Sequence, residues 1–147
     1  MLYADFSRGY VLKMDKGEEF HKTLIKFINQ KRIPSAFYQA IGSVTDVELG
    51  YFSTLQENYK GRCFRGDYEL INATGNISLV DGKPVAHTHI VLGDKEFTTF
   101  SGHLVECTIT LTAEIFLFPI DIALLRKQDP DHNFKCLDLP HVFLRGS

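Results

Sequence analysis

The chain has 147 residues, of which 44% are hydrophobic and 12% aromatic, so it can fold around a core of its own and is not typical of a disordered protein. Its 16 basic and 18 acidic residues give a formal charge of −2, which argues against tight, autonomous binding to DNA through a strongly basic surface. No apolar run approaches the roughly 18 residues of a membrane-spanning helix, so we expect no membrane partner.

Two further features indicate a cytoplasmic protein. The three cysteines lie far apart and form no CxxC motif, which is typical of a reduced, intracellular compartment. The first 20 residues contain early acidic side chains and no continuous apolar core, so they are not typical of a secretory signal.

The first predicted elements are a short strand over residues 10–14 and a helix over residues 18–32. The helix is predicted from the i, i+4, i+7, i+8 spacing of four apolar residues: Phe20, Leu24, Phe27 and Ile28. Acidic residues at its start and basic residues at its end suit the helix dipole, and Pro34 prevents its continuation.

Strands are predicted for most of the remaining chain. Their ranges are 36–41, 45–51, 68–71, 76–80, 85–92, 105–118, 120–125 and 134–137. Gly42-Ser43 and Thr74-Gly75 are expected to separate neighbouring strands, and residues 53–61 to form a polar loop. The predicted architecture is a single α+β domain over residues 1–147, a mostly antiparallel sheet with one main helix packed on it.

Three histidines carry the clearest chemical signal of the chain. His87 and His89 are two residues apart in a predicted strand, so their side chains share one face. A returning strand would bring His103 beside them. Three converging imidazoles are typical of a divalent-metal site with an open fourth position, while a polar histidine cluster without metal is the alternative.

The fourth position of such a site is expected to take water or a small-molecule ligand. Cys107 is four residues beyond His103, which places it about 13 Å along an extended strand and too far away to bind the same ion. Its parity also groups it with the apolar side chains of its strand, so we expect a core residue. Glu69 is the carboxylate that we expect to orient a ligand histidine, because it interrupts an apolar strand.

The other histidines and the basic residues suggest less. His21, His132 and His141 have no partner at ligand spacing and are expected to be hydrogen-bonded or exposed. Arg62 and Arg65 flank a phenylalanine, an arrangement that could contact an anion or a nucleic acid, although a solvated edge is the default interpretation.

Several short motifs, in order, resemble those of the plants-and-prokaryotes-conserved (PPC) domain over residues 10–118. They include Gly17-Glu18-Glu19, Ala40-Ile41-Gly42-Ser43-Val44, Leu49-Gly50-Tyr51-Phe52, Tyr68-Glu69-Leu70-Ile71, Thr74-Gly75-Asn76-Ile77, Ala86-His87-Thr88-His89, Ser101-Gly102-His103-Leu104 and Thr112-Ala113-Glu114-Ile115. The resemblance is to the prokaryotic, single-domain form of this family.

The resemblance implies an α/β sandwich built on a seven-stranded antiparallel sheet, a homotrimer, and a zinc ion on His87, His89 and His103. It also implies an association with DNA, although the chain has no Arg-Gly-Arg-Pro tract, the AT-hook that plant members carry beside this domain. A regulatory or protein-interaction role is therefore kept beside DNA binding. The alternative is a zinc-dependent lyase or hydrolase acting on a small carbonyl compound, because the PPC fold is similar to that of acetolactate decarboxylase.

Overall fold

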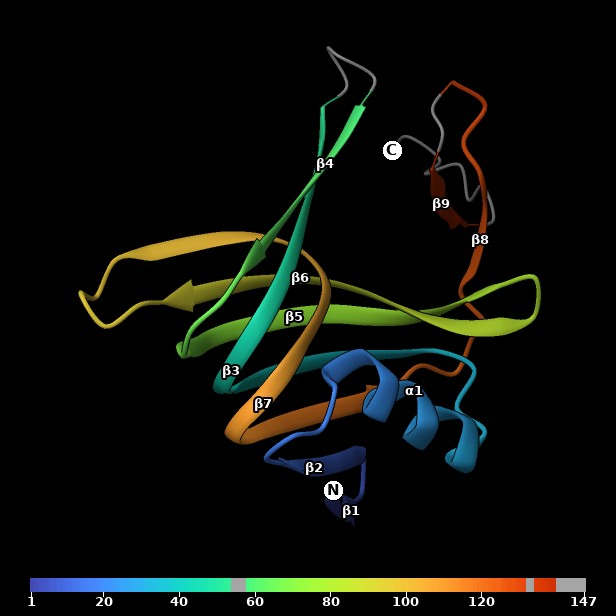
Figure 1. The fold of residues 1–147 in the computed structure, drawn as a ribbon. Helices are drawn as coiled ribbons and strands as arrows, with labels where there is room; N and C mark the ends of the chain where they lie inside the picture. Colours follow the sequence, from blue (N-terminus) through green and yellow to red (C-terminus); the bar gives the residue numbers. More distant parts are fainter. Residues whose placement is uncertain (54–57, 132–133, 140–147) are drawn as a thin grey trace, which may run out of the picture.

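The computed structural model describes residues 1–53, 58–131 and 134–139, and Figure 1 shows its fold. In chain order the elements are β1 (Leu2–Phe6), β2 (Gly9–Asp15), α1 (Phe20–Lys31), β3 (Ala36–Ser53), β4 (Asn58–Phe64), β5 (Tyr68–Val80), β6 (Lys83–Gly93), β7 (Thr99–Pro119), β8 (Leu125–Gln128) and β9 (Lys135–Asp138). The predicted class, α+β with one main helix on a large antiparallel sheet, is confirmed.

The described strands form one nine-stranded sheet, two strands more than the seven expected. Its main path runs β1-β2-β7-β3-β5-β8-β9, β4 adds to β3, and β6 pairs with both β5 and β7. All pairs are antiparallel except the short contact of β5 with β8. Because β3, β5, β6 and β7 pair in a closed ring, the sheet curves strongly and brings β6 beside β7.

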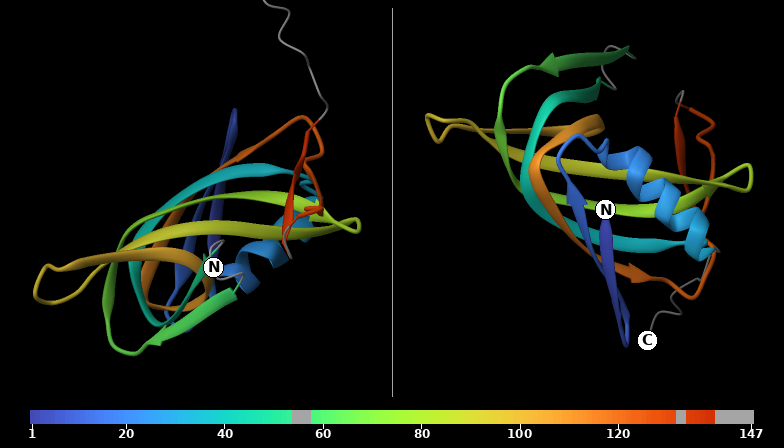
Figure 2. Two further views of the ribbon diagram at one scale, coloured as in Figure 1. Left: turned by 90° about the horizontal axis from the view of Figure 1, so that it is seen from above. Right: turned by 60° about the horizontal axis from the view of Figure 1, so that its bottom comes forward.

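Helix α1 packs on one face of this curved sheet (Figure 2), where it contacts β6 and β7. Its buried residues are the four that the apolar spacing predicted: Phe20, Leu24, Phe27 and Ile28. The helix begins at Phe20, so Glu18 and Glu19 precede it, and the carboxylate of Glu106 on β7 instead accepts hydrogen bonds from the first backbone N–H groups. No helix in the described ranges is long and apolar enough to cross a membrane.

Two predicted strand breaks are wrong, because β3 and β5 run without interruption through Gly42 and Gly75. A Cβ at Gly75 would lie 2.5 Å from the hydroxyl of Tyr38 and 2.6 Å from the carbonyl oxygen of His87. A Cβ at Gly42 would collide with the backbone of β7 at Thr112. These glycines therefore permit close approach of neighbouring strands, as in many sheets, and do not mark turns.

Three further boundaries differ from the prediction. β1 was not expected, and β4 occupies part of the predicted 53–61 loop, of which residues 54–57 lie outside the described ranges. Residues 120–124 are not a strand, and β8 begins at Leu125. β1 and β4 lie at edges of the sheet, and β8 joins it through a single pair with β5, Leu79 with Leu125, so pairing within the folded sheet decides strand formation there more than local pattern does.

Candidate metal centre

The three predicted ligand histidines come together where β6 and β7 pair. His89 lies directly opposite His103, and His87 is on the same face two residues earlier. One ring nitrogen from each residue lies within 4.8 Å of the other two, and the ring centroids are 5.1 to 5.6 Å apart. A tetrahedral zinc ion with bonds of about 2.0–2.1 Å holds its ligand nitrogens about 3.3–3.4 Å apart, so the nitrogens must approach one another by at most about 1.5 Å to bind one ion.

The donor set fits a divalent transition metal with an open coordination position. Imidazole suits zinc, copper, iron and nickel, and three histidines leave one position of a tetrahedral ion free. In the described part of the chain no cysteine or carboxylate joins this cluster. Cys107 is a buried core residue, as its parity predicted, and burial raises the pKa of its thiol.

Burial keeps two of the three imidazoles neutral, which is the form that binds a metal. His87 is half-buried, and desolvation followed by the charge of Arg126 lowers its pKa to about 4. Desolvation is also the main cause that lowers the pKa of His103. At neutral pH neither proton competes with a metal ion for these rings.

A buried polar network fixes the strand from the opposite face. Thr88, between His87 and His89, is fully buried, and its hydroxyl lies 2.6 Å from Nε2 of His21. Nδ1 of His21 is 2.9 Å from the Val105 carbonyl, which can only accept, so Nδ1 carries the proton and Nε2 accepts from Thr88. The Thr88 oxygen in turn accepts from the hydroxyl of Tyr38. Helix α1, β3 and β6 are thereby joined directly behind the histidine pair.

Arg126 on β8 reaches the trio from the neighbouring hairpin. Its Nη2 lies 3.1 Å from Nδ1 of His87 and 3.2 Å from the side-chain oxygen of Asn76. Its Nε donates to the Ser78 hydroxyl at 2.7 Å, and its Nη1 donates to the Lys135 carbonyl at 3.0 Å. The guanidinium is therefore held in place by contacts to three strands.

The structure does not bring Glu69 to the histidines, so the expectation that it orients a ligand is corrected. Glu69 is exposed and lies opposite Gly93, four residues or about 13 Å along β6 from His89. An exposed carboxylate needs no buried partner, which removes the reason for that expectation.

The remaining predicted residues lie elsewhere. Arg62 and Arg65 are exposed on and just after β4, and the Arg62 guanidinium stacks 4.7 Å from the centre of the Phe64 ring. His21 is hydrogen-bonded, as expected, while His132 and His141 lie outside the described residues.

Sequence reasoning missed Arg126, Thr88 and Tyr38 as neighbours of the site. Thr88 did carry a signal, because a hydroxyl residue between two face-sharing histidines points into the core and needs a partner there. Arg126 gave no such signal, since its approach depends on the path of a hairpin about 40 residues later in the chain.

Comparison with known proteins identifies the family. The family model of the Plants and Prokaryotes Conserved (PCC) domain, the PPC domain named above, matches residues 1–121. None of the curated proteins matches this chain.

Three solved structures share the fold along nearly their whole length. A "putative DNA binding protein" from Bacteroides thetaiotaomicron is 26% identical, with a TM-score of 0.89 and coverage of 93% of this chain and 96% of that one. A plant- and prokaryote-conserved protein from Pyrococcus horikoshii is 32% identical, with a TM-score of 0.84 and coverage of 96% and 97%. A metal-containing protein from Archaeoglobus fulgidus is 25% identical, with a TM-score of 0.84 and coverage of 95% and 99%. The chain therefore belongs to the PPC domain family.

Proposed function

We propose that this PPC-domain protein binds one divalent metal ion, zinc by family resemblance, through His87, His89 and His103, and that it acts as a homotrimeric binding or regulatory protein. The observation that carries the metal is the convergence of three ring nitrogens from two paired strands within 4.8 Å. The name of the Archaeoglobus relative, a metal-containing protein, supports the same conclusion.

A metal titration tests this proposal directly. Zinc added to the chelator-stripped protein at about 100 times its dissociation constant stabilises the folded state by about 2.7 kcal/mol. For a chain of this size that raises the melting temperature by roughly 5–10 °C. The shift should disappear in His103→Ala and persist in Lys83→Ala, which changes an exposed residue of β6. A zinc-induced shift of equal size in His103→Ala would refute the site.

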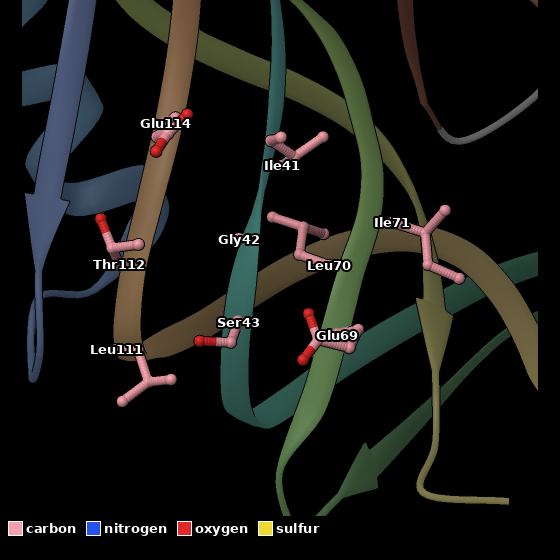
Figure 3. Close-up of a pocket in the computed structure, with 9 residues that line it drawn as sticks. All are labelled: Ile41, Gly42, Ser43, Glu69, Leu70, Ile71, Leu111, Thr112 and Glu114. Atoms are coloured by element: carbon pink, nitrogen blue, oxygen red, sulfur yellow. The ribbon is translucent and has the colours of Figure 1, made fainter. Parts of the chain in front are cut away.

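Self-association is supported by the outer face of the sheet. Large apolar side chains on β3 and β7 are exposed there, among them Phe37 (42% exposed), Ile41 (53%), Leu111 (74%) and Phe116 (48%). Figure 3 shows a groove of about 530 Å³ on this face, lined by Ile41 and Leu111 but also by Glu69 and Glu114, in which the buried Ser43 hydroxyl has no hydrogen-bond partner. Several large apolar side chains exposed on neighbouring strands are typical of a protein–protein interface.

Sedimentation velocity tests the trimer. Phe116→Glu places a charge in the proposed interface and should convert trimers to monomers. Phe97→Glu makes the same substitution at an exposed phenylalanine of the β6–β7 turn and should leave the trimer intact. A wild-type protein that sediments as a monomer at micromolar concentration would exclude the trimer.

DNA is the partner that the names of the relatives suggest, and the exposed Arg62 and Arg65 are its candidate contacts. The net charge of −2 predicts weak, salt-sensitive binding. A gel-shift series between about 50 and 200 mM salt should show a shift at low salt that weakens steeply and is reduced in Arg62→Ala. Absence of any shift at micromolar protein would exclude direct DNA binding and leave a protein or small-molecule partner.

An enzymatic role is the second candidate, favoured by the open coordination position beside a guanidinium. A divalent ion held by three histidines can polarise a carbonyl group or activate water. Hydrolysis or lysis of a small carbonyl compound that stops on chelation and in His89→Ala would support this role. Equal turnover by the metal-free protein would remove it.

A further inference from the structure

Arg126 carries a positive charge that no acidic side chain in the described part of the chain balances. Its four hydrogen bonds go to Ser78, Lys135, Asn76 and His87, all of them neutral groups. Among the described residues no carboxylate lies within ion-pair distance of its guanidinium, which is only partly exposed. A half-buried guanidinium without a counter-charge is costly, so this one is positioned for a ligand that is anionic.

The hydrogen bond from Arg126 to His87 has a consequence for metal binding. Nη2 can only donate, so Nδ1 of His87 must supply a lone pair to it. A neutral imidazole that accepts at Nδ1 carries its proton on Nε2 and has no second lone pair for a metal. If the metal binds Nδ1, it displaces Nη2. If it binds Nε2, the proton moves to Nδ1 and faces the Arg126 donor. In both cases the metal and this hydrogen bond exclude each other.

Metal binding therefore frees an N–H donor of Arg126 beside the ion. The contacts to Ser78 and Lys135 use Nε and Nη1, so they can hold the side chain in place when the contact to His87 is lost. Three neutral imidazoles leave the charge of the ion unreduced, and the guanidinium adds a further positive charge. The loaded site is then strongly cationic, with one open coordination position and one freed guanidinium N–H beside it, which suits an anionic group such as a carboxylate.

We propose that Arg126 is the anion-binding residue of this site: it competes with the metal for His87 and, when the metal is bound, hydrogen-bonds the carboxylate group of a small ligand that reaches the ion. This inference rests on the proposed metal site and adds to it the chemical class of the ligand. It assigns a role in ligand binding to the β8–β9 hairpin.

The test uses cobalt(II), whose visible absorption reports its ligands, and acetate as the carboxylate probe. Wild type, Arg126→Ala and Lys127→Ala are loaded with cobalt, and acetate is titrated while the visible spectrum is recorded. Lys127 is an exposed cation on the same strand that pairs with Asp138, so its removal controls for net charge. We expect acetate affinity to fall about 10-fold or more in Arg126→Ala, the loss expected for a charge-assisted hydrogen bond, and to stay within about 2-fold in Lys127→Ala.

The same variants test the competition with the metal. Without acetate, Arg126→Ala should bind cobalt about 3- to 10-fold more tightly than wild type, since a competing hydrogen bond is removed. Arg126→Gln, which is neutral but can still donate to Ser78 or Asn76, should repeat both effects, because they come from loss of the guanidinium and not from loosening of the hairpin. Acetate affinity that is unchanged in Arg126→Ala and Arg126→Gln would overturn the anion-binding role, and unchanged cobalt affinity would overturn the competition. Failure of the wild type to take up cobalt would refute the metal proposal itself, which separates the two failures.

Discussion

Replacing Gly75 by alanine should destabilise the protein, although alanine is intrinsically better than glycine within a strand by about 0.5–1 kcal/mol. The new Cβ would lie 2.5 Å from the Tyr38 hydroxyl and 2.6 Å from the His87 carbonyl oxygen, and neither belongs to a side chain that can swing away freely. Overpacking of this kind costs about 1–3 kcal/mol. Displacing Tyr38 from Thr88 adds about 0.5–1.5 kcal/mol for the lost hydrogen bond. From the middle of each range the net loss is about 2 kcal/mol, or roughly 4–8 °C in melting temperature.

Thermal unfolding of the metal-free protein, followed by circular dichroism, measures this loss. Gly93→Ala is the matched control, because the one tight contact of its Cβ would be with the flexible end of the Ile71 side chain, at 3.1 Å. We expect the control to melt within about 3 °C of wild type, which corresponds to less than about 1 kcal/mol. The reasoning is refuted if Gly75→Ala melts at or above the temperature of Gly93→Ala.

Two further predictions concern the network behind the histidine pair. Thr88→Val keeps the side-chain shape but leaves Nε2 of His21 without its donor and the Tyr38 hydroxyl without its acceptor. Urea unfolding should therefore show that the free energy of unfolding falls by about 2–3 kcal/mol, whereas Thr99→Val, at an exposed position, should change it very little. An unchanged stability of Thr88→Val would contradict the network. Burial lowers the pKa of His21 in the folded protein. Below about pH 6.5 the unfolded state therefore binds a proton that the folded state does not. The stability that the neutral His21 contributes is fully present above about pH 6.5 and is lost as the pH falls through the folded pKa. Chelator-stripped protein should therefore lose stability between pH 7.5 and about 5, and His21→Gln should lose less; equal slopes for the two proteins would contradict this assignment.

Much of the site could be predicted because its signal is local. The alternation of a strand places His87 and His89 on one face whatever surrounds them, and a single return of the chain brings in His103. The helix was equally accessible, since its apolar spacing matches the four residues that it buries.

The rest depends on contacts between distant parts of the chain. Gly75 was interpreted as a strand break, although it is the point where Tyr38 and the backbone of β6 approach β5. Glu69 was expected to be buried from its apolar neighbours, but the outer face of β5 is itself apolar at Ile71 (47% exposed), so the pattern there did not distinguish inside from outside. Arg126 reaches His87 only through the β8–β9 hairpin, whose attachment to β5 a linear pattern does not contain.

The metal content of the purified protein tests the central claim most directly. Wild type, His87→Ala, His103→Ala and Gly93→Ala are expressed and purified without added metal or histidine tag, and metal per chain is measured by plasma mass spectrometry. The account predicts about one divalent ion per chain in wild type and in Gly93→Ala, and less than about one tenth of that in both histidine variants. Wild-type protein that contains no metal and takes none up at pH 7–8, or histidine variants that retain the full content, would contradict it.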